Sequence, residues 1–156
     1  VSEEGNLVGK VTDVTDSAAR ITLITDQSSS VSAVVDETEA SGVVRHGASA
    51  SSLILDRVEK DEMVEERNTV ITAGWTTDRF ESLFPPGIPL GVVESVGQQD
   101  VDLFKRIQIA PLVDFDSLAA VVVLIEKERP AQSRQNTGQG QQGNGAGRRQ
   151  ETTSRP

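Results

Sequence analysis

The feature of this sequence that most constrains its fold is a period-two alternation of aliphatic residues in short runs. The run RITLITD (20–26) places Ile21 and Leu23 on one face, and the runs VSAVVD (31–36) and LILDRV (53–58) alternate in the same way. Successive side chains of a β-strand point to opposite faces, so the alternation indicates half-buried strands. We therefore expect an all-β protein, built as a barrel or a sandwich. Further β-branched runs lie at 69–74, 90–96, 106–110 and 120–125.

The segment TDRFESLF (77–84) is the one place where we expect a short helix. Asp78 is a residue type that caps a first helical turn, and the prolines that follow Phe84 would end the helix.

The chain also contains an internal echo. The segments VGKVTDV (8–14) and LGVVESV (90–96) share the pattern apolar-Gly-x-Val-x-x-Val, and each precedes a polar turn and a strand that begins with Arg-Ile. A glycine at the same strand position in both copies suggests the sharp bend of a barrel corner. We therefore expect two small β-barrels packed together, at 1–60 and 61–126, with strand exchange between the halves left open. The alternative is coincidence among valine-rich strands.

The composition changes near residue 127. Residues 127–156 are mainly Gln, Gly, Arg, Ser and Thr without an apolar cluster, so we expect a disordered tail. Residues 1–128 carry a net charge of −13 and residues 129–156 a net charge of +4. A second interpretation of the tail is therefore a cationic tether that contacts anionic wall or membrane polymers.

Several classes of function lack the residues they need. The chain has no Cys, no Tyr, one Trp and one His, so zinc ribbons, thiol catalysis and stacking platforms for bases are disfavoured, and the acidic body argues against nucleic-acid binding. His46, in a predicted turn, lacks a Gly-x-Ser-x-Gly elbow as a nucleophile partner. The acidic stretches DETE (36–39) and DFD (114–116) lack the spacing of a calcium loop. We expect no enzyme, no metal and no cofactor.

The stretch FPPGIPLGVVESV (84–96) predicts a rigid corner that leads into a strand. Pro86-Gly87 suits the centre of a type II turn, and Pro89 forces Ile88 to be extended. Phe84 is expected to pin this corner to the core rather than to form an exposed contact.

Six segments occur in the order seen in the rod-shape-determining protein MreC family, and together they resemble it over about residues 5–126. They are LVGKVTDV, LITDQSSSVSAVV, SGVVRHG, TVITAGW, FPPGIPLGVVESV and FKRIQIAPLVDFDSLAAVVVLI. The resemblance identifies a signature turn, whose matching residues here are Phe84, Pro85, Gly87, Pro89 and Gly91. The chain departs from the family pattern where Arg67-Asn68 replaces Gly-Asp, where Ala73 replaces Ser, at Trp75 and at PLVD (111–114).

The resemblance implies a non-enzymatic scaffold on the extracytoplasmic face of the cell membrane. Such a protein self-associates and organises the elongation machinery of the cell wall, with a class B penicillin-binding transpeptidase and MreD among its partners. The chain begins at Val1 and lacks the family's membrane helix and coiled coil, so we expect a fragment of a membrane-anchored protein. The alternatives are a generic envelope β-barrel binding module and a serine-protease-like hydrolase. Because aromatic residues tend to anchor interfaces, our candidate partner-binding residues are Trp75, Phe80 and Phe84.

Overall fold

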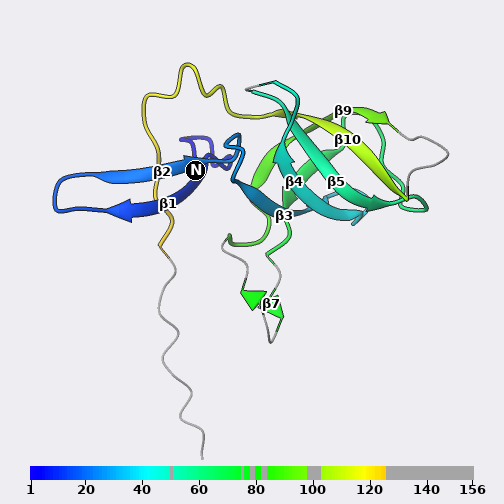
Figure 1. Ribbon diagram of the computed structural model, residues 1–156, viewed down its shortest axis with the longest axis horizontal. Coiled ribbons are helices and arrows are strands. Elements are labelled where there is room, and N and C mark those ends of the chain that lie inside the picture. The colour runs from blue at the N-terminus through cyan, green and yellow to red at the C-terminus, as the bar shows by residue number, and fades with distance from the viewer. Residues whose placement is uncertain (50, 75, 78–79, 82–83, 98–102, 126–156) are drawn as a thin grey trace, which may run out of the picture. The chain divides into compact units, whose positions relative to one another are not determined.

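The computed structural model describes residues 1–49, 51–74, 76–77, 80–81, 84–97 and 103–125, and for 76–77 and 80–81 the backbone alone. These residues contain ten β-strands and no helix, which confirms the all-β class (Figure 1). The strands are β1 (Gly9–Val14), β2 (Ala19–Leu23), β3 (Ser30–Val35), β4 (Ser41–His46), β5 (Leu53–Glu59), β6 (Thr69–Thr72), β7 (Thr76–Thr77), β8 (Phe80–Glu81), β9 (Pro89–Gly97) and β10 (Phe104–Pro111).

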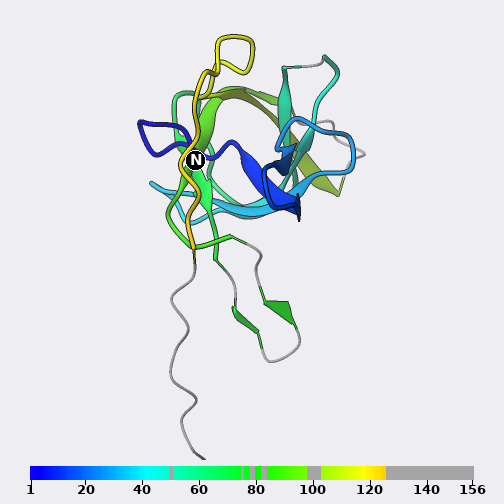
Figure 2. The same ribbon diagram turned by 90° about the vertical axis from the view of Figure 1, so that its left-hand side faces the viewer.

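Six of these strands form one closed antiparallel barrel in the order β10-β5-β4-β3-β6-β9 (Figure 2). Its interior is filled by the aliphatic residues whose alternation the sequence displays. Val31, Ala33 and Val35 of β3 are fully buried, as are Leu53 and Leu55 of β5. The same cluster takes in Val44, Val58, Val70, Leu90, Val93, Ile107 and Ile109.

The prediction of two barrels differs from this arrangement. The closed barrel takes β3, β4 and β5 from before residue 60 and β6, β9 and β10 from after it. Closure depends on pairing between β10 and β5, with Ile109 opposite Leu53. The expected boundary at residue 60 therefore falls between β5 and β6, within this one closed barrel.

The internal echo does correspond to two hairpins. β1 pairs with β2, and β9 pairs with β10. The glycines of the two copies are both needed for close approach: a Cβ at Gly9 would lie 2.1 Å from the Thr22 carbonyl oxygen, and one at Gly91 would lie 2.5 Å from that of Ala110. The hairpins differ in their neighbours, because β9 and β10 also pair with β6 and β5, whereas β1 and β2 pair only with each other among the described residues.

The helix expected at 77–84 is wrong for the residues that can be described there. Thr76–Thr77 and Phe80–Glu81 are the paired strands β7 and β8, with Thr77 opposite Phe80. The N–H and C=O groups that a helical turn would have used take part in this antiparallel pairing instead. The presence of Asp78 in the sequence therefore did not predict a helix here. The tail predicted at 127–156 lies outside the described residues.

Candidate functional site

The signature turn is held by the side chain of Thr72, at the end of β6. Its hydroxyl donates to the Pro85 carbonyl oxygen at 2.5 Å and accepts the Ile88 N–H at 2.9 Å. The backbone of Thr72 makes two further bonds, as acceptor from the Gly87 N–H and as donor to the Ile88 carbonyl, both at 2.9 Å. Thr72 is 1% exposed, so a buried polar group here is fully used in fixing the turn.

The backbone of the turn has the geometry that its sequence requires. Gly87 has a φ of +78°, which a type II turn needs at its second central residue. Pro89 begins β9, and Gly91 follows in the same strand opposite Pro111. Phe84 is 8% exposed and belongs to the core cluster, as does Ile88. Phe84 therefore packs into the core, as expected from the sequence, and does not form an exposed aromatic contact.

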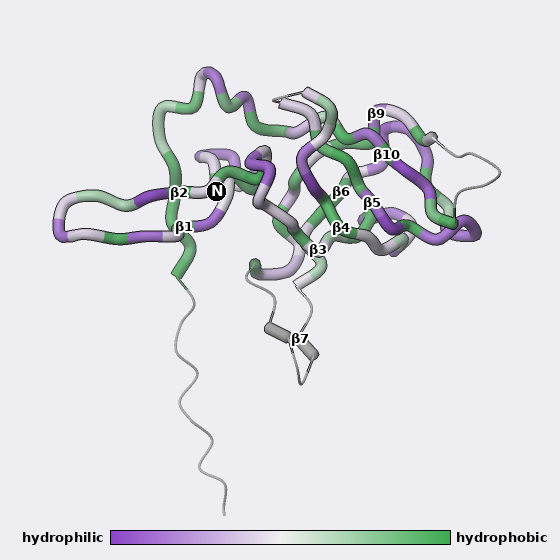
Figure 3. Tube along the Cα trace, viewed as in Figure 1, coloured by the Kyte–Doolittle hydropathy of each residue, from purple (hydrophilic) through white to green (hydrophobic). Residues whose placement is uncertain are grey.

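An apolar cavity of about 280 Å³ lies against this turn, and we call it the docking groove. Three parts of the chain line it. They are the N-terminal segment with the β1–β2 hairpin, including Leu7, Val11 and Ile21, the signature turn with Phe84 and Ile88, and the run 121–124. Figure 3 shows the hydrophobic colouring of the segment that ends at residue 125, which passes the hairpin.

The run Val122–Ile125 exposes an unusual amount of apolar surface. The exposed fractions of its four side chains are 49%, 53%, 53% and 87%. The sequence predicts a strand here, but the structure assigns none. A contiguous exposed aliphatic run beside an apolar groove is typical of an interaction surface.

The backbone around the groove is also open to pairing. Val1 and Val122 exchange hydrogen bonds, from the Val1 nitrogen to the Val122 carbonyl at 2.9 Å and from the Val122 N–H to the Val1 carbonyl at 2.8 Å. Within the described residues β1 and β2 each keep one unpaired edge, and such edges accept an added strand.

The structure brings together only part of the predicted partner-binding set. Phe84 lines the docking groove, and so does Pro85 of the signature turn. Trp75 lies outside the described residues, and Phe80 is placed only as backbone in β8.

Sequence reasoning missed the groove residues Val11, Ile21 and 121–124. Val11 and Ile21 are opposite each other in the β1–β2 ladder, and the exposure of Val11, at 38%, is what distinguishes it from the buried valines of the barrel. The available signal was the apolar run LAAVVVLI (118–125), which contains the groove residues 121–124.

The single histidine, His46, has its Nδ1 2.8 Å from the Thr25 carbonyl oxygen, which is a structural contact. The residues that the structure describes contain no group of three His, Asp or Glu side chains placed to hold a metal ion. Nor is any helix in that part of the chain long and apolar enough to span a bilayer.

Known proteins share both the sequence pattern and the barrel. Residues 1–125 match the family model described as rod shape-determining protein MreC, barrel core. No curated protein sequence matches the chain. Among solved structures, MreC from Listeria monocytogenes is 26% identical with a TM-score of 0.63, and the match covers 75% of this chain and 55% of that one.

Two further structures share the fold at lower identity. MreC from Pseudomonas aeruginosa is 22% identical with a TM-score of 0.62, over 70% of this chain and 68% of that one. A complex between penicillin-binding protein PBP2 and MreC from Helicobacter pylori matches at 16% identity and a TM-score of 0.56, over 70% of this chain and 63% of that one. The chain thus spans less than two thirds of the Listeria and Helicobacter chains.

Proposed function

Since the chain belongs to the family of rod shape-determining proteins MreC, we propose that it is a non-enzymatic scaffold that holds proteins of the cell-wall elongation complex at the docking groove. The observation that carries this proposal is the apolar groove flanked by the exposed run Val122–Ile125. Apolar surface of this kind is favourable to bury against a partner, at about 25 cal/mol for each Å² removed from water.

A penicillin-binding transpeptidase is the partner we favour. The Helicobacter structure is a complex of an MreC with PBP2, a penicillin-binding protein, and it shares this fold. The unpaired edges of β1 and β2 suit a strand or hairpin supplied by such a partner.

The remaining parts of the proposal come from the family. We infer that the protein self-associates, that MreD is a further partner, and that an N-terminal segment anchors the protein at the extracytoplasmic face of the cell membrane. Several copies held together would raise the effective concentration of the docked transpeptidase. A generic envelope binding module would share the groove but would not assemble such a complex.

The test compares two valines of the same hairpin. Val11 lines the docking groove, whereas Val14, which is 70% exposed, does not. Val11→Asp places a charge in a surface that binding would desolvate, so the affinity for a transpeptidase ectodomain should fall at least about tenfold. Val14→Asp is the matched control and should bind as the wild type does, by biolayer interferometry. Equal binding of Val11→Asp and wild type would reject the groove as the docking site.

A further inference from the structure

A second hollow, of about 1000 Å³, lies on the wall of the barrel and shares no lining residue with the docking groove. One side is formed by His46 at the end of β4 and by residues 47–49 and Ser52 that follow it, and strands β5, β9 and β10 contribute the rest of the lining. Most of the strand side chains that line it are the outward members of the alternation. Glu94, Arg106 and Gln108 are exposed, while Val93, Ile107 and Ile109 beside them are buried in the core. The volume is in the range of sites that hold small ligands.

A β-bulge helps to form this hollow. In the ladder between β9 and β10, Gln108 is opposite Ser95 and Ile109 is opposite Val93, so Glu94 is an extra residue on β9. A bulge re-aims the side chains around it and often lies next to a functional site. Here both Glu94 and Ser95 line the hollow, although neighbouring residues of a regular strand would point to opposite faces.

The hollow contains two opposite charges that do not neutralise each other. Among the described residues, neither Glu94 nor Arg106 takes part in a salt bridge or a side-chain hydrogen bond. The residue opposite Arg106 on β9 is Gly97, which has no side chain to cover the guanidinium group. Both groups are therefore available to a ligand, and a guanidinium is well suited to a carboxylate.

Neutral hydrogen-bonding groups surround these charges. The Ser95 hydroxyl donates to the Gln108 amide oxygen at 3.1 Å, which orients the Gln108 amide. The Nδ1 of His46 is 2.8 Å from the Thr25 carbonyl oxygen, and because a carbonyl only accepts, this nitrogen carries the hydrogen. The site thus offers a cation, an anion, an amide and an imidazole, and none of its described lining residues is Phe, Tyr or Trp.

We propose that this hollow binds the peptide portion of cell-wall material, a short peptide that carries a free carboxylate and a free ammonium group at separate positions. Arg106 would bind the carboxylate, and Glu94 the ammonium group. The wall as the source of the peptide rests on the proposed function. Binding here would give the scaffold a contact with the wall while the docking groove holds a protein partner.

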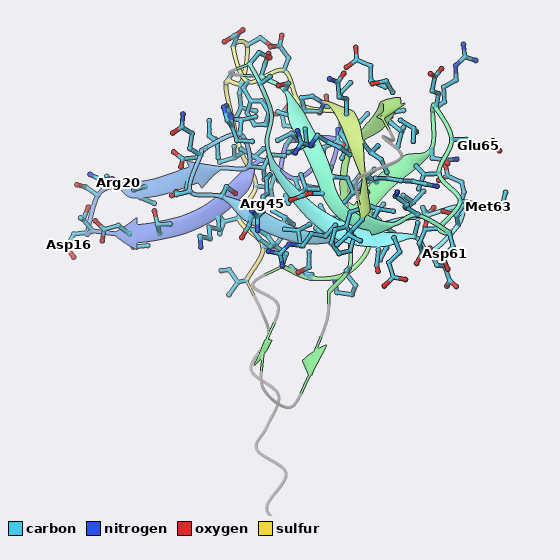
Figure 4. All side chains as sticks on the ribbon, turned by 45° about the vertical axis from the view of Figure 1, so that its right-hand side comes forward. Asp16, Arg20, Arg45, Asp61, Met63 and Glu65 are labelled. Atoms are coloured by element: carbon cyan, nitrogen blue, oxygen red, sulfur yellow. The ribbon has the colours of Figure 1, made fainter. Side chains whose placement is uncertain are left out.

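The experiment is a titration of the ¹⁵N-labelled chain with a synthetic wall tetrapeptide that has a free C-terminal carboxylate and a free side-chain amine. We expect shifts in the backbone amides of the residues that line the hollow, and a dissociation constant that rises at least about fivefold in Arg106→Gln and in Glu94→Gln. Arg20→Gln is the matched control, because Arg20 is an exposed arginine on β2, outside the hollow (Figure 4). Its titration should equal that of the wild type.

A second peptide, with its amine acetylated and its carboxylate amidated, should bind at least about fivefold more weakly. The proposal is overturned if no shifts arise at about 10 mM peptide, a concentration that would reveal binding as weak as millimolar. It is also overturned if the capped peptide binds equally well, which would indicate recognition of an extended protein segment instead. A chain that binds the transpeptidase but not the peptide would refute this inference alone and leave the proposed function standing.

Discussion

Replacement of Thr72 by valine would remove one oxygen from the centre of the signature turn and leave the volume of the side chain nearly unchanged. The Thr72 hydroxyl satisfies both the Pro85 carbonyl and the Ile88 N–H, and the bond to Ile88 is buried. In the valine variant a methyl group faces both partners. An unsatisfied buried donor costs about 1–3 kcal/mol and a lost neutral hydrogen bond about 1 kcal/mol. We therefore expect Thr72→Val to lower the free energy of unfolding by about 2–3 kcal/mol.

The chain supplies a matched control for this change. The Thr38 hydroxyl is buried and has no hydrogen-bond partner among the described residues. Thr38→Val makes the same chemical replacement but breaks no bond, so it should be neutral or slightly stabilising.

Urea unfolding followed by circular dichroism measures both variants. A loss of about 2–3 kcal/mol in Thr72→Val corresponds to a fall in melting temperature of about 6–12 °C for a domain of this size. If Thr72→Val and Thr38→Val unfolded at the same urea concentration, Thr72 could not be the residue that fixes the signature turn.

Three further changes test other parts of the fold. Arg67 has a φ of +74°, a conformation that glycine adopts without strain, so Arg67→Gly should raise the urea midpoint, with a gain of about 0.5–1 kcal/mol; a lower midpoint would contradict the assignment of strain. Gly91→Ala would place a Cβ 2.4 Å from the Ile109 Cγ2 atom, so it should lower the free energy of unfolding by about 2 kcal/mol or more in the same assay. An unchanged free energy of unfolding would show that β9 and β10 can move apart to accommodate the methyl group. The Thr69 N–H bonds to both carboxylate oxygens of Glu37 and lowers the pKa of Glu37 below 4.5. Because the pKa of Glu37 is lower in the folded state, its carboxylate stabilises the fold above about pH 4.5, and this stabilisation is lost as the pH falls through the folded pKa. The free energy of unfolding of Glu37→Gln should therefore be lower than that of the wild type at about pH 7, and this difference should shrink towards about pH 3. A difference that stayed constant with pH would exclude the mechanism.

The part of the fold that could be predicted is the part set by local alternation. Val31, Ala33 and Val35 follow one another at period two, and all three are buried as that period requires. The positive φ of Gly87 likewise follows from the Pro-Gly pair, because few other sequences favour that turn.

The parts that could not be predicted depend on contacts between distant residues. The pairing of β10 with β5, in which Ile109 lies opposite Leu53, closes the barrel. No local sequence pattern predicts which strands pair with each other. The docking groove joins residues near both ends of the described chain, so its members share no motif. Thr72 looks in the sequence like any strand threonine, and its role appears only when the turn at Pro85 lies beside it.

The loops show the limits of capping signals. Asp78 followed by a mixed sequence resembles a helix start, yet the flanking residues pair as β7 and β8. A capping residue stabilises a helix that forms for other reasons, and a short segment without an apolar stripe has little else to favour it.

The central proposal is that this domain holds a penicillin-binding transpeptidase as its protein partner. The most direct test is the mass in solution, by sedimentation equilibrium, of the chain alone, of a penicillin-binding transpeptidase ectodomain alone, and of their mixture. We predict a species in the mixture that is heavier than any species found with either partner alone. A mixture that sediments as two independent components at concentrations of about 100 µM, well above the dissociation constant of a specific complex, would contradict the claim.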